Sequence, residues 1–223
     1  IYNVSNKANI KAAAKYAGGV AGYAGPMSSF KNITNNANVT ATTGYAGGVL
    51  AGSDADANAT IDSCYNYGVV TAKTYAGGIA GSASATISHS LNDGAAMATG
   101  NYAGGIIAEA KAPSNVTYSN NTGNVEAIQY AGGIAAITAV HTAPARMAVD
   151  SCSNTGTITP GITTGSAGYY GGIVGQGGAG LSITNCYNTA DIVANSSNAP
   201  KARNIAGIVA RMTGTKVARD TIY

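Results

Sequence analysis

The stretch Tyr45-Ala-Gly-Gly-Val49 decides the fold, because it returns along almost the whole chain. The clear copies begin at Tyr16, Tyr45, Tyr75, Tyr102 and Tyr130, followed by Tyr169-Tyr-Gly-Gly-Ile173 and a weaker copy, Asn204-Ile-Ala-Gly-Ile208. Successive copies start 27 to 39 residues apart, which makes seven units in 223 residues. A period of this length is typical of architectures in which each unit packs on the next.

Other positions keep a fixed distance within each unit. An asparagine opens an Asn-x-[Gly/Ala] turn in every unit, at Asn6, Asn35, Asn66, Asn92, Asn121, Asn154 and Asn188. Five residues earlier an apolar residue marks the start of the unit, at Ile1, Phe30, Ile61, Ile87, Val116, Val149 and Ile183. Two residues before the asparagine lies a small or apolar residue, at Val4, Ile33, Cys64, Ser90, Ser119, Cys152 and Cys186. Since this last position accepts Val and Ile, it is predicted to face inward.

The repeat favours strands over helices. Glycine pairs and β-branched residues oppose helix formation, and no run keeps a 3.6-residue period. Each unit instead offers short strands separated by Gly and Asn turns, which bury their apolar side only when units stack. We therefore expect an all-β fold, a parallel β-solenoid of about seven coils forming one domain over residues 1–223. Coils would be about 4.8 Å apart, with Tyr45, Tyr75 and Tyr102 aligned.

Each column then has an expected role. The Ile and Val columns fill a narrow interior, and the asparagines form a hydrogen-bonded ladder, since a stacked amide donates to one neighbour and accepts from the other. The tyrosines stack along one edge of the rod. The paired glycines supply either a positive φ at a corner or a close approach of two backbones. Length variation is expected in two insertions, at 139–147 and 160–167.

Composition excludes several functions. Charged residues make up 9% of the chain and the net charge is +3, so no basic cluster suits a run of phosphates and nucleic acid is not an expected partner. The mildly basic end is expected to be a solvated last coil, through Lys201, Arg203, Arg211, Lys216 and Arg219. No run of about 18 apolar residues is present, so no membrane span is predicted.

The chain resembles the GLUG-motif repeats of bacterial surface and adhesin-like proteins. The resemblance is carried by Tyr45-Ala-Gly-Gly-Val-Leu-Ala-Gly52 with Ile61-Asp-Ser-Cys-Tyr-Asn-Tyr-Gly-Val-Val70, and again by Tyr169–Gly175 with Ile183–Ile192. It implies an extracellular or cell-surface protein, in which such repeats form adhesin rods or lie beside the catalytic part of surface peptidases. It brings no catalytic residues to this chain. Ala replaces the turn glycine at Ala37 and Ala190.

Residues with catalytic or metal-binding potential are few. The three cysteines are predicted to be buried free thiols, although Cys152 and Cys186, in adjacent coils, would lie within disulfide range. His89 and His141 lack metal-ligand spacing, and His141 is expected to be exposed in the longest insertion. Asp54, Asp56 and Asp62 are expected to lie in a solvated loop, with a calcium site or a glycosidase-like acid pair as the alternatives. No catalytic residue, metal site or cofactor is predicted.

These observations predict a non-catalytic structural or adhesive rod. The tyrosine column is expected to stabilise the ladder, and with one ring face exposed it would also grip sugars. Thr221-Ile222-Tyr223 is expected to open an eighth unit, and no polar cap appears at either end. The expected partners are therefore further repeats or other copies stacked head to tail, and surface glycans. The alternatives are an accessory repeat region of a secreted enzyme and a carbohydrate-binding module.

Overall fold

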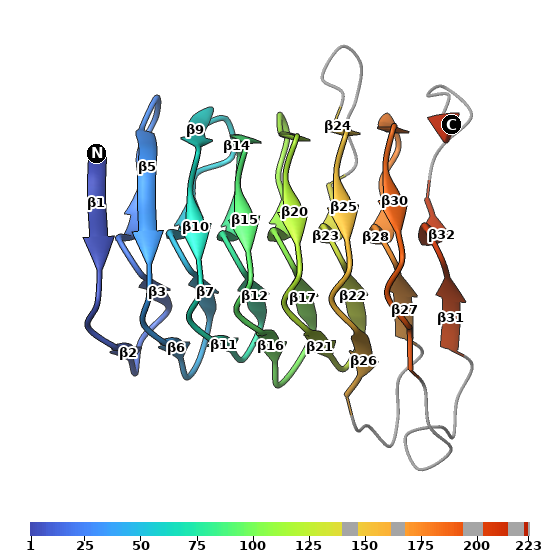
Figure 1. The fold of residues 1–223 in the computed structure, drawn as a ribbon, viewed down its shortest axis with the longest axis horizontal. Helices are drawn as coiled ribbons and strands as arrows, with labels where there is room; N and C mark the ends of the chain where they lie inside the picture. The colour runs from blue at the N-terminus through green and yellow to red at the C-terminus, as the bar shows by residue number, and fades with distance from the viewer. Residues whose placement is uncertain (140–146, 162–167, 194–202, 214–220, 223) are drawn as a thin grey trace.

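The computed structural model describes residues 1–139, 147–161, 168–193, 203–213 and 221–222, and within them the regular elements are all strands. Figure 1 shows the chain winding as successive coils along one long axis, with the N-terminus at one end and the C-terminal residues at the other. The expected positions of His141, Lys201, Lys216 and Arg219, and the interiors of both insertions, lie outside the described residues.

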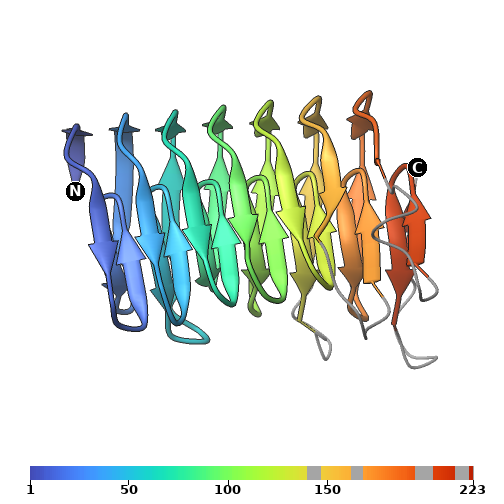
Figure 2. The same cartoon turned by 90° about the horizontal axis from the view of Figure 1, so that it is seen from below.

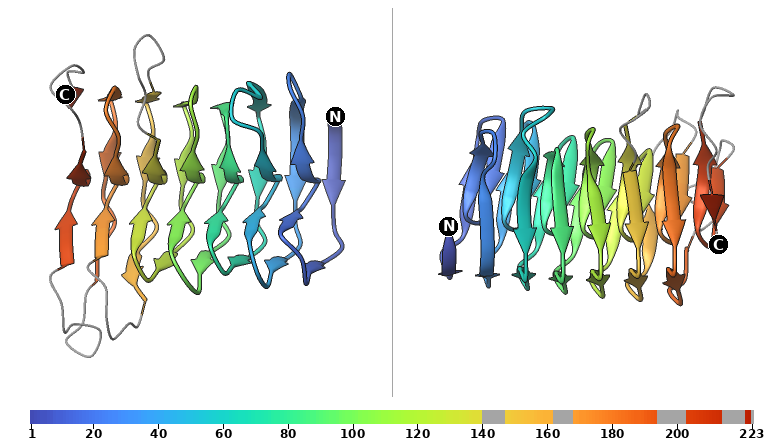
Figure 3. Two further views of the ribbon diagram at one scale, coloured as in Figure 1. Left: turned by 180° about the vertical axis from the view of Figure 1, so that it is seen from behind. Right: turned by 90° about the horizontal axis from the view of Figure 1, so that it is seen from above.

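The strands form four parallel sheets that run along the rod, as Figures 2 and 3 show from other sides. The 13-stranded sheet, here sheet A, contains two ladders joined through β5 (Ser29–Asn35), which also pairs with β1 (Tyr2–Asn6). Its first ladder holds β9 (Ala59–Asp62), β14 (Ala85–Ser88), β19 (Asn115–Thr117), β24 (Met147–Asp150), β29 (Leu181–Thr184) and β33 (Thr221–Ile222). Its second ladder holds β10 (Tyr65–Asn66), β15 (Leu91–Asn92), β20 (Asn120–Asn121), β25 (Ser153–Asn154) and β30 (Tyr187–Asn188).

The other three sheets each take one strand from a coil. Sheet B holds β2 (Ile10–Ala12), β6 (Val39–Ala41), β11 (Val70–Ala72), β16 (Ala96–Ala98), β21 (Val125–Ala127) and β26 (Ile158–Pro160). Sheet C holds β3 (Tyr16–Gly18), β7 (Tyr45–Gly47), β12 (Tyr75–Gly77), β17 (Tyr102–Gly104), β22 (Tyr130–Gly132), β27 (Gly168–Gly171) and β31 (Arg203–Ala206). Sheet D holds β4 (Ala21–Ala24), β8 (Leu50–Ser53), β13 (Ala80–Ala83), β18 (Ile107–Ala110), β23 (Ala135–Thr138), β28 (Val174–Gly177) and β32 (Val209–Met212).

The register between coils follows the sequence repeat and confirms the parallel β-solenoid. Tyr75 pairs with Tyr45 on one side and with Tyr102 on the other, so equivalent residues lie directly over one another. The weaker seventh copy keeps this register, since Asn204 pairs with Tyr169. Ile222 pairs with Ile183, so the chain does open an eighth unit at β33.

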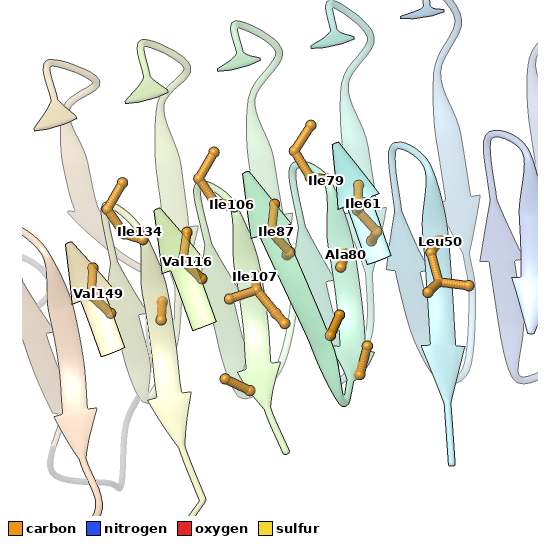
Figure 4. Packing of buried hydrophobic residues seen from close by; sticks show 14 of the residues in the cluster. Leu50, Ile61, Ile79, Ala80, Ile87, Ile106, Ile107, Val116, Ile134 and Val149 are labelled. Atoms are coloured by element: carbon orange, nitrogen blue, oxygen red, sulfur yellow. The ribbon is translucent and has the colours of Figure 1, made fainter. Parts of the chain in front are cut away.

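Two apolar clusters fill the interior. The larger one packs the Ile/Val column of sheet A, such as Ile61 and Ile87, against Leu50, Ile79 and Ile107 from the opposite wall. Figure 4 shows these side chains meeting between the walls. The smaller cluster lies between sheets B and C and consists mainly of Val and Ala, with Tyr170 in the place that Ala takes in the five preceding coils. The small side chains therefore let the walls approach closely.

The paired glycines are explained by close approach rather than by a positive φ. A Cβ atom on Gly77 would lie 1.7 Å from the carbonyl oxygen of Ala80, and one on Gly78 would lie 2.1 Å from that of Gly105. Both distances are far below any contact between carbon and oxygen. Among the described glycines, a positive φ occurs at Gly180, outside the pairs.

A further column was not expected from the sequence. The third residue of each unit is not glycine, yet it has a positive φ of 48° to 56° in all seven units. This left-handed column consists of Asn3, Asn32, Ser63, His89, Tyr118, Ser151 and Asn185. From the third unit on, it lies between the two ladders of sheet A, two residues after the buried Ile/Val column and one residue before the column that holds Cys64.

Candidate functional site

The seven asparagines form one hydrogen-bonded ladder along the inside of the rod. Each Nδ2 donates to the Oδ1 of the asparagine in the next coil, over 2.7 to 2.8 Å, from Asn6 through to Asn188. Each Nδ2 also donates to the backbone oxygen two residues ahead, which holds the Asn-x-Gly turn. The five inner asparagines are fully buried. The ladder thus satisfies polar groups that would otherwise be buried without partners.

The six tyrosines of the repeat form a continuous stack. Neighbouring ring centroids lie 4.6 to 5.2 Å apart, and the ring planes differ by 4° to 19°. The stack runs along sheet C from Tyr16 to Tyr169, and each ring is partly exposed. Such stacking contributes about 0.5–1.5 kcal/mol per pair beyond the burial of area.

Both ends of the tyrosine stack are also covered. The Tyr23 ring meets Tyr16 edge-on, with centroids 4.9 Å apart, and the Lys15 ammonium lies 5.0 Å from the Tyr16 centroid. At the other end the Arg211 guanidinium lies 4.8 Å from the Tyr169 centroid and donates to its hydroxyl over 2.9 Å.

This arrangement limits what the tyrosine column can bind. A sugar that stacks on an aromatic side chain needs a free ring face, and the faces of the inner rings are occupied by the rings above and below. The column offers ring edges and hydroxyl groups to the solvent. Its evident role is to hold successive coils together.

Alkaline pH is expected to weaken this stack. Burial, then the negative charge of Glu109, raises the pKa of Tyr75 well above 10, and burial also raises the pKa of Tyr102. A raised pKa of an acid means that the folded state retains the proton. The resulting stability is complete below the ordinary tyrosine pKa near 10 and is lost as the pH rises toward the folded value.

The measurement is phenolate absorbance against pH, together with unfolding curves at pH 9 and pH 11. We expect Tyr75→Phe to lose less stability between these two pH values than the wild type does. An equal loss in both proteins would contradict the prediction.

The three cysteines are free, as expected. Cys64 and Cys152 are buried as predicted, whereas Cys186 is only partly buried. Burial raises the pKa of the Cys64 thiol to about 11, so it remains protonated at neutral pH. The backbone N–H of Cys152 donates to the Cys186 sulfur over 3.4 Å, and the neighbouring thiol and burial raise the pKa of Cys152. Cys64 and Cys152 therefore act as buried packing groups, whereas the hydrogen bond with Cys152 lowers the pKa of the Cys186 thiol.

The structure brings together a group of residues that sequence reasoning missed. The Asp62 carboxylate lies 3.0 Å from His89 Nδ1, accepts from Ser88 Oγ over 2.9 Å, and lies 3.5 Å from Lys31 Nζ. The hydrogen bonds from His89 and Ser88 lower the pKa of Asp62. His89 in turn stacks on Tyr118, with centroids 5.3 Å apart. The positions within the repeat could have predicted this group. Asp62 follows Ile61 by one residue, and His89 follows the equivalent Ile87 by two, so the two side chains belong to neighbouring positions in adjacent coils.

The acidic loop does not behave as one cluster. Asp54 accepts a hydrogen bond from the Tyr23 hydroxyl, whereas Asp62 interacts with Lys31, Ser88 and His89. In the described part of the chain, no three His, Cys, Asp or Glu side chains gather as a metal site. Over the same residues, no helix has the length and apolar character needed to cross a membrane.

Comparison with known proteins gives one informative result. No protein-family model and no curated protein matches the chain. A crystal structure of a protein from Bacteroides ovatus, named a putative immunoglobulin A1 protease, is similar to it in fold, with a TM-score of 0.51 and 18% identity. The similarity covers 90% of this chain and 65% of that one. At this identity the likeness supports the β-solenoid fold.

Proposed function

We propose that this chain is a non-catalytic structural rod of an extracellular surface protein, which extends by adding coils and presents its outer face for adhesion. The observation that supports this most is the unbroken register of equivalent residues through seven strands in sheets C and D. Inside the rod, the asparagine side chains form hydrogen bonds between coils. The resemblance to GLUG-motif repeats supports placing the rod at the cell surface.

The first coil of the described structure has a strand edge at which another coil would pair. In the first coil, β2 pairs only with β6, so its other edge is open in the described structure. Ile10 and Ala12 bond to the second coil, through Ile10 N to Asn38 O and Thr42 N to Ala12 O. Because parallel strands alternate their bonding sides, the N–H and C=O of Lys11 point to the open edge. Another coil, from further repeats or another copy, would pair there.

Lys11→Pro tests end-to-end pairing without disturbing the existing ladder. Proline removes the N–H that faces the open edge, while Ile10 and Ala12 keep their bonds to the second coil. We expect the mass of the wild-type protein, measured by light scattering, to rise with concentration, and that of Lys11→Pro to rise less. Lys11→Ala is the matched control. A wild type that stays a single chain at every concentration would contradict pairing between copies.

A second candidate is an accessory repeat region next to the catalytic part of a secreted enzyme. It is favoured by the similarity in fold to the Bacteroides ovatus protein, whose name is that of a protease. The full-length gene distinguishes the two candidates. A cell-wall sorting signal with more repeats would support the rod, and an adjacent catalytic domain would support the accessory region.

A further inference from the structure

The outer face of sheet A carries a feature that the repeat does not require. In the left-handed column, five members are Asn or Ser, whose short polar side chains tolerate a positive φ. The other two are His89 and Tyr118, both with a φ of 48°. Histidine is among the residues enriched at a positive φ, but a bulky tyrosine there is a genuine outlier, and strained positions of this kind gather at functional sites.

Folding does not explain the two rings, because both remain in solvent. Tyr118 is 56% exposed, and the His89 side chain is 61% exposed. The rings stack on one another with planes 3° apart, so each covers one face of its neighbour. The next member of the column beyond Tyr118 is Ser151, which has no ring. Among the described residues, no ring covers the face of Tyr118 on that side.

A hydrogen-bonded group of side chains lies in the two coils beyond this open ring face. The backbone N–H of Tyr118 donates to the carbonyl oxygen of Asp150, which places the two residues in adjacent coils. The Asp150 carboxylate accepts from Asn185 Nδ2 over 2.9 Å, from Ser151 Oγ over 3.2 Å and from Thr184. Those bonds from Thr184 and Asn185 lower the pKa of Asp150. Within the described residues, no basic side chain pairs with it.

We propose that Tyr118, His89, Asp62 and Asp150 form a binding site for neutral glycans on the outer face of sheet A. This inference rests on the adhesive part of the proposed function and names its site and ligand class. A sugar presents an apolar C–H face, which would pack on the free face of Tyr118, and a rim of hydroxyl groups. Asp150, Ser151 and Asn185, which bond to one another in the two coils beyond Tyr118, would bond to those hydroxyls.

The flanking charges select the kind of glycan. Asp62 lies on the His89 side of the ring pair and Asp150 on the Tyr118 side, and the environment of both favours the ionised form. Asp62 is paired with Lys31, but Asp150 has no basic partner among the described residues and would repel sialylated, sulfated or uronic-acid sugars. Within its column the ring pair is bordered by Ser63 and Ser151 rather than by further rings, which suits a sugar better than a protein partner.

The test uses the full chain on a glycan microarray that carries lactose-, N-acetyllactosamine-, cellobiose- and chitobiose-terminated glycans beside sialylated and sulfated ones. We expect binding to neutral members, and a loss of about tenfold in affinity for Tyr118→Asn, since a ring contact and its buried area contribute on this scale. Asparagine occupies this position in three other coils, so this variant is expected to fold. Tyr67→Asn is the matched control, because Tyr67 is 49% exposed and lies outside the site.

Three results would overturn the site: no binding to any neutral glycan, a preference for acidic glycans, or equal losses in Tyr118→Asn and Tyr67→Asn. Asp150→Asn should weaken binding to neutral glycans and reduce the discrimination against acidic ones. Light scattering of Tyr118→Asn separates this inference from the rod itself. If the wild type assembles end to end but binds no glycan, the glycan site alone is contradicted. If it binds glycans but does not assemble, self-pairing alone is contradicted.

Discussion

Gly78→Ala is expected to destabilise the rod by more than about 4 kcal/mol, or to prevent folding of the central coils. The added Cβ would lie 2.1 Å from the carbonyl oxygen of Gly105 in the next coil and 2.2 Å from Cγ of Asn92. The first is a backbone atom held by the strand ladder, and the second is a fully buried side chain bonded on both sides. Neither atom can move without breaking hydrogen bonds between coils.

Urea unfolding followed by circular dichroism measures this loss, with Gly25→Ala as the control. Gly25 has no heavy atom within 4 Å of the position of an added Cβ, and its φ lies outside the left-handed region. Alanine there should leave stability unchanged or raise it by about 0.4–1 kcal/mol, since it restricts the unfolded chain. Similar unfolding midpoints for the two variants would show that the close approach at Gly78 does not exist.

Asn92→Ala is expected to cost about 3–5 kcal/mol, because it breaks the ladder at its centre. Asn92 Nδ2 donates to Asn121 Oδ1 and to the Gly94 carbonyl oxygen, and its Oδ1 accepts from Asn66. Asn66, Asn92 and Asn121 are fully buried, so water cannot replace the lost partner. Each group left without a partner costs about 1–3 kcal/mol.

Asn6→Ala is the control for the ladder, since Asn6 occupies the same column in the first coil but is only partly buried. It donates to Asn35 and accepts from Ala8 N, and solvent can reach both groups. We expect a loss of no more than about 1 kcal/mol. Because repeat proteins unfold partly coil by coil, whole unfolding curves should be compared. Equal effects of Asn6→Ala and Asn92→Ala would argue against a role for burial.

The period of the sequence was enough to predict the fold and the columns. The recurrence of Tyr45-Ala-Gly-Gly-Val49 predicts that Tyr45, Tyr75 and Tyr102 stack, because a unit of this size buries its apolar face only against its copies. The same reasoning predicts the ladder through Asn92, since an amide both donates and accepts. Residues at the same distance from the start of their repeat therefore occupy the same position on successive coils.

Only the tertiary structure decided what these columns leave available for binding. The tyrosine faces are closed because consecutive rings stack within about one strand spacing, a distance set by the backbone ladder rather than by the residue type. The ring with a free face is Tyr118, which projects outward because its backbone adopts a positive φ. The residue types of the repeat do not predict that angle. The direction of a side chain depends on the backbone conformation and on how the opposite walls pack. Which residues lie over one another in adjacent coils depends on the period of the sequence alone.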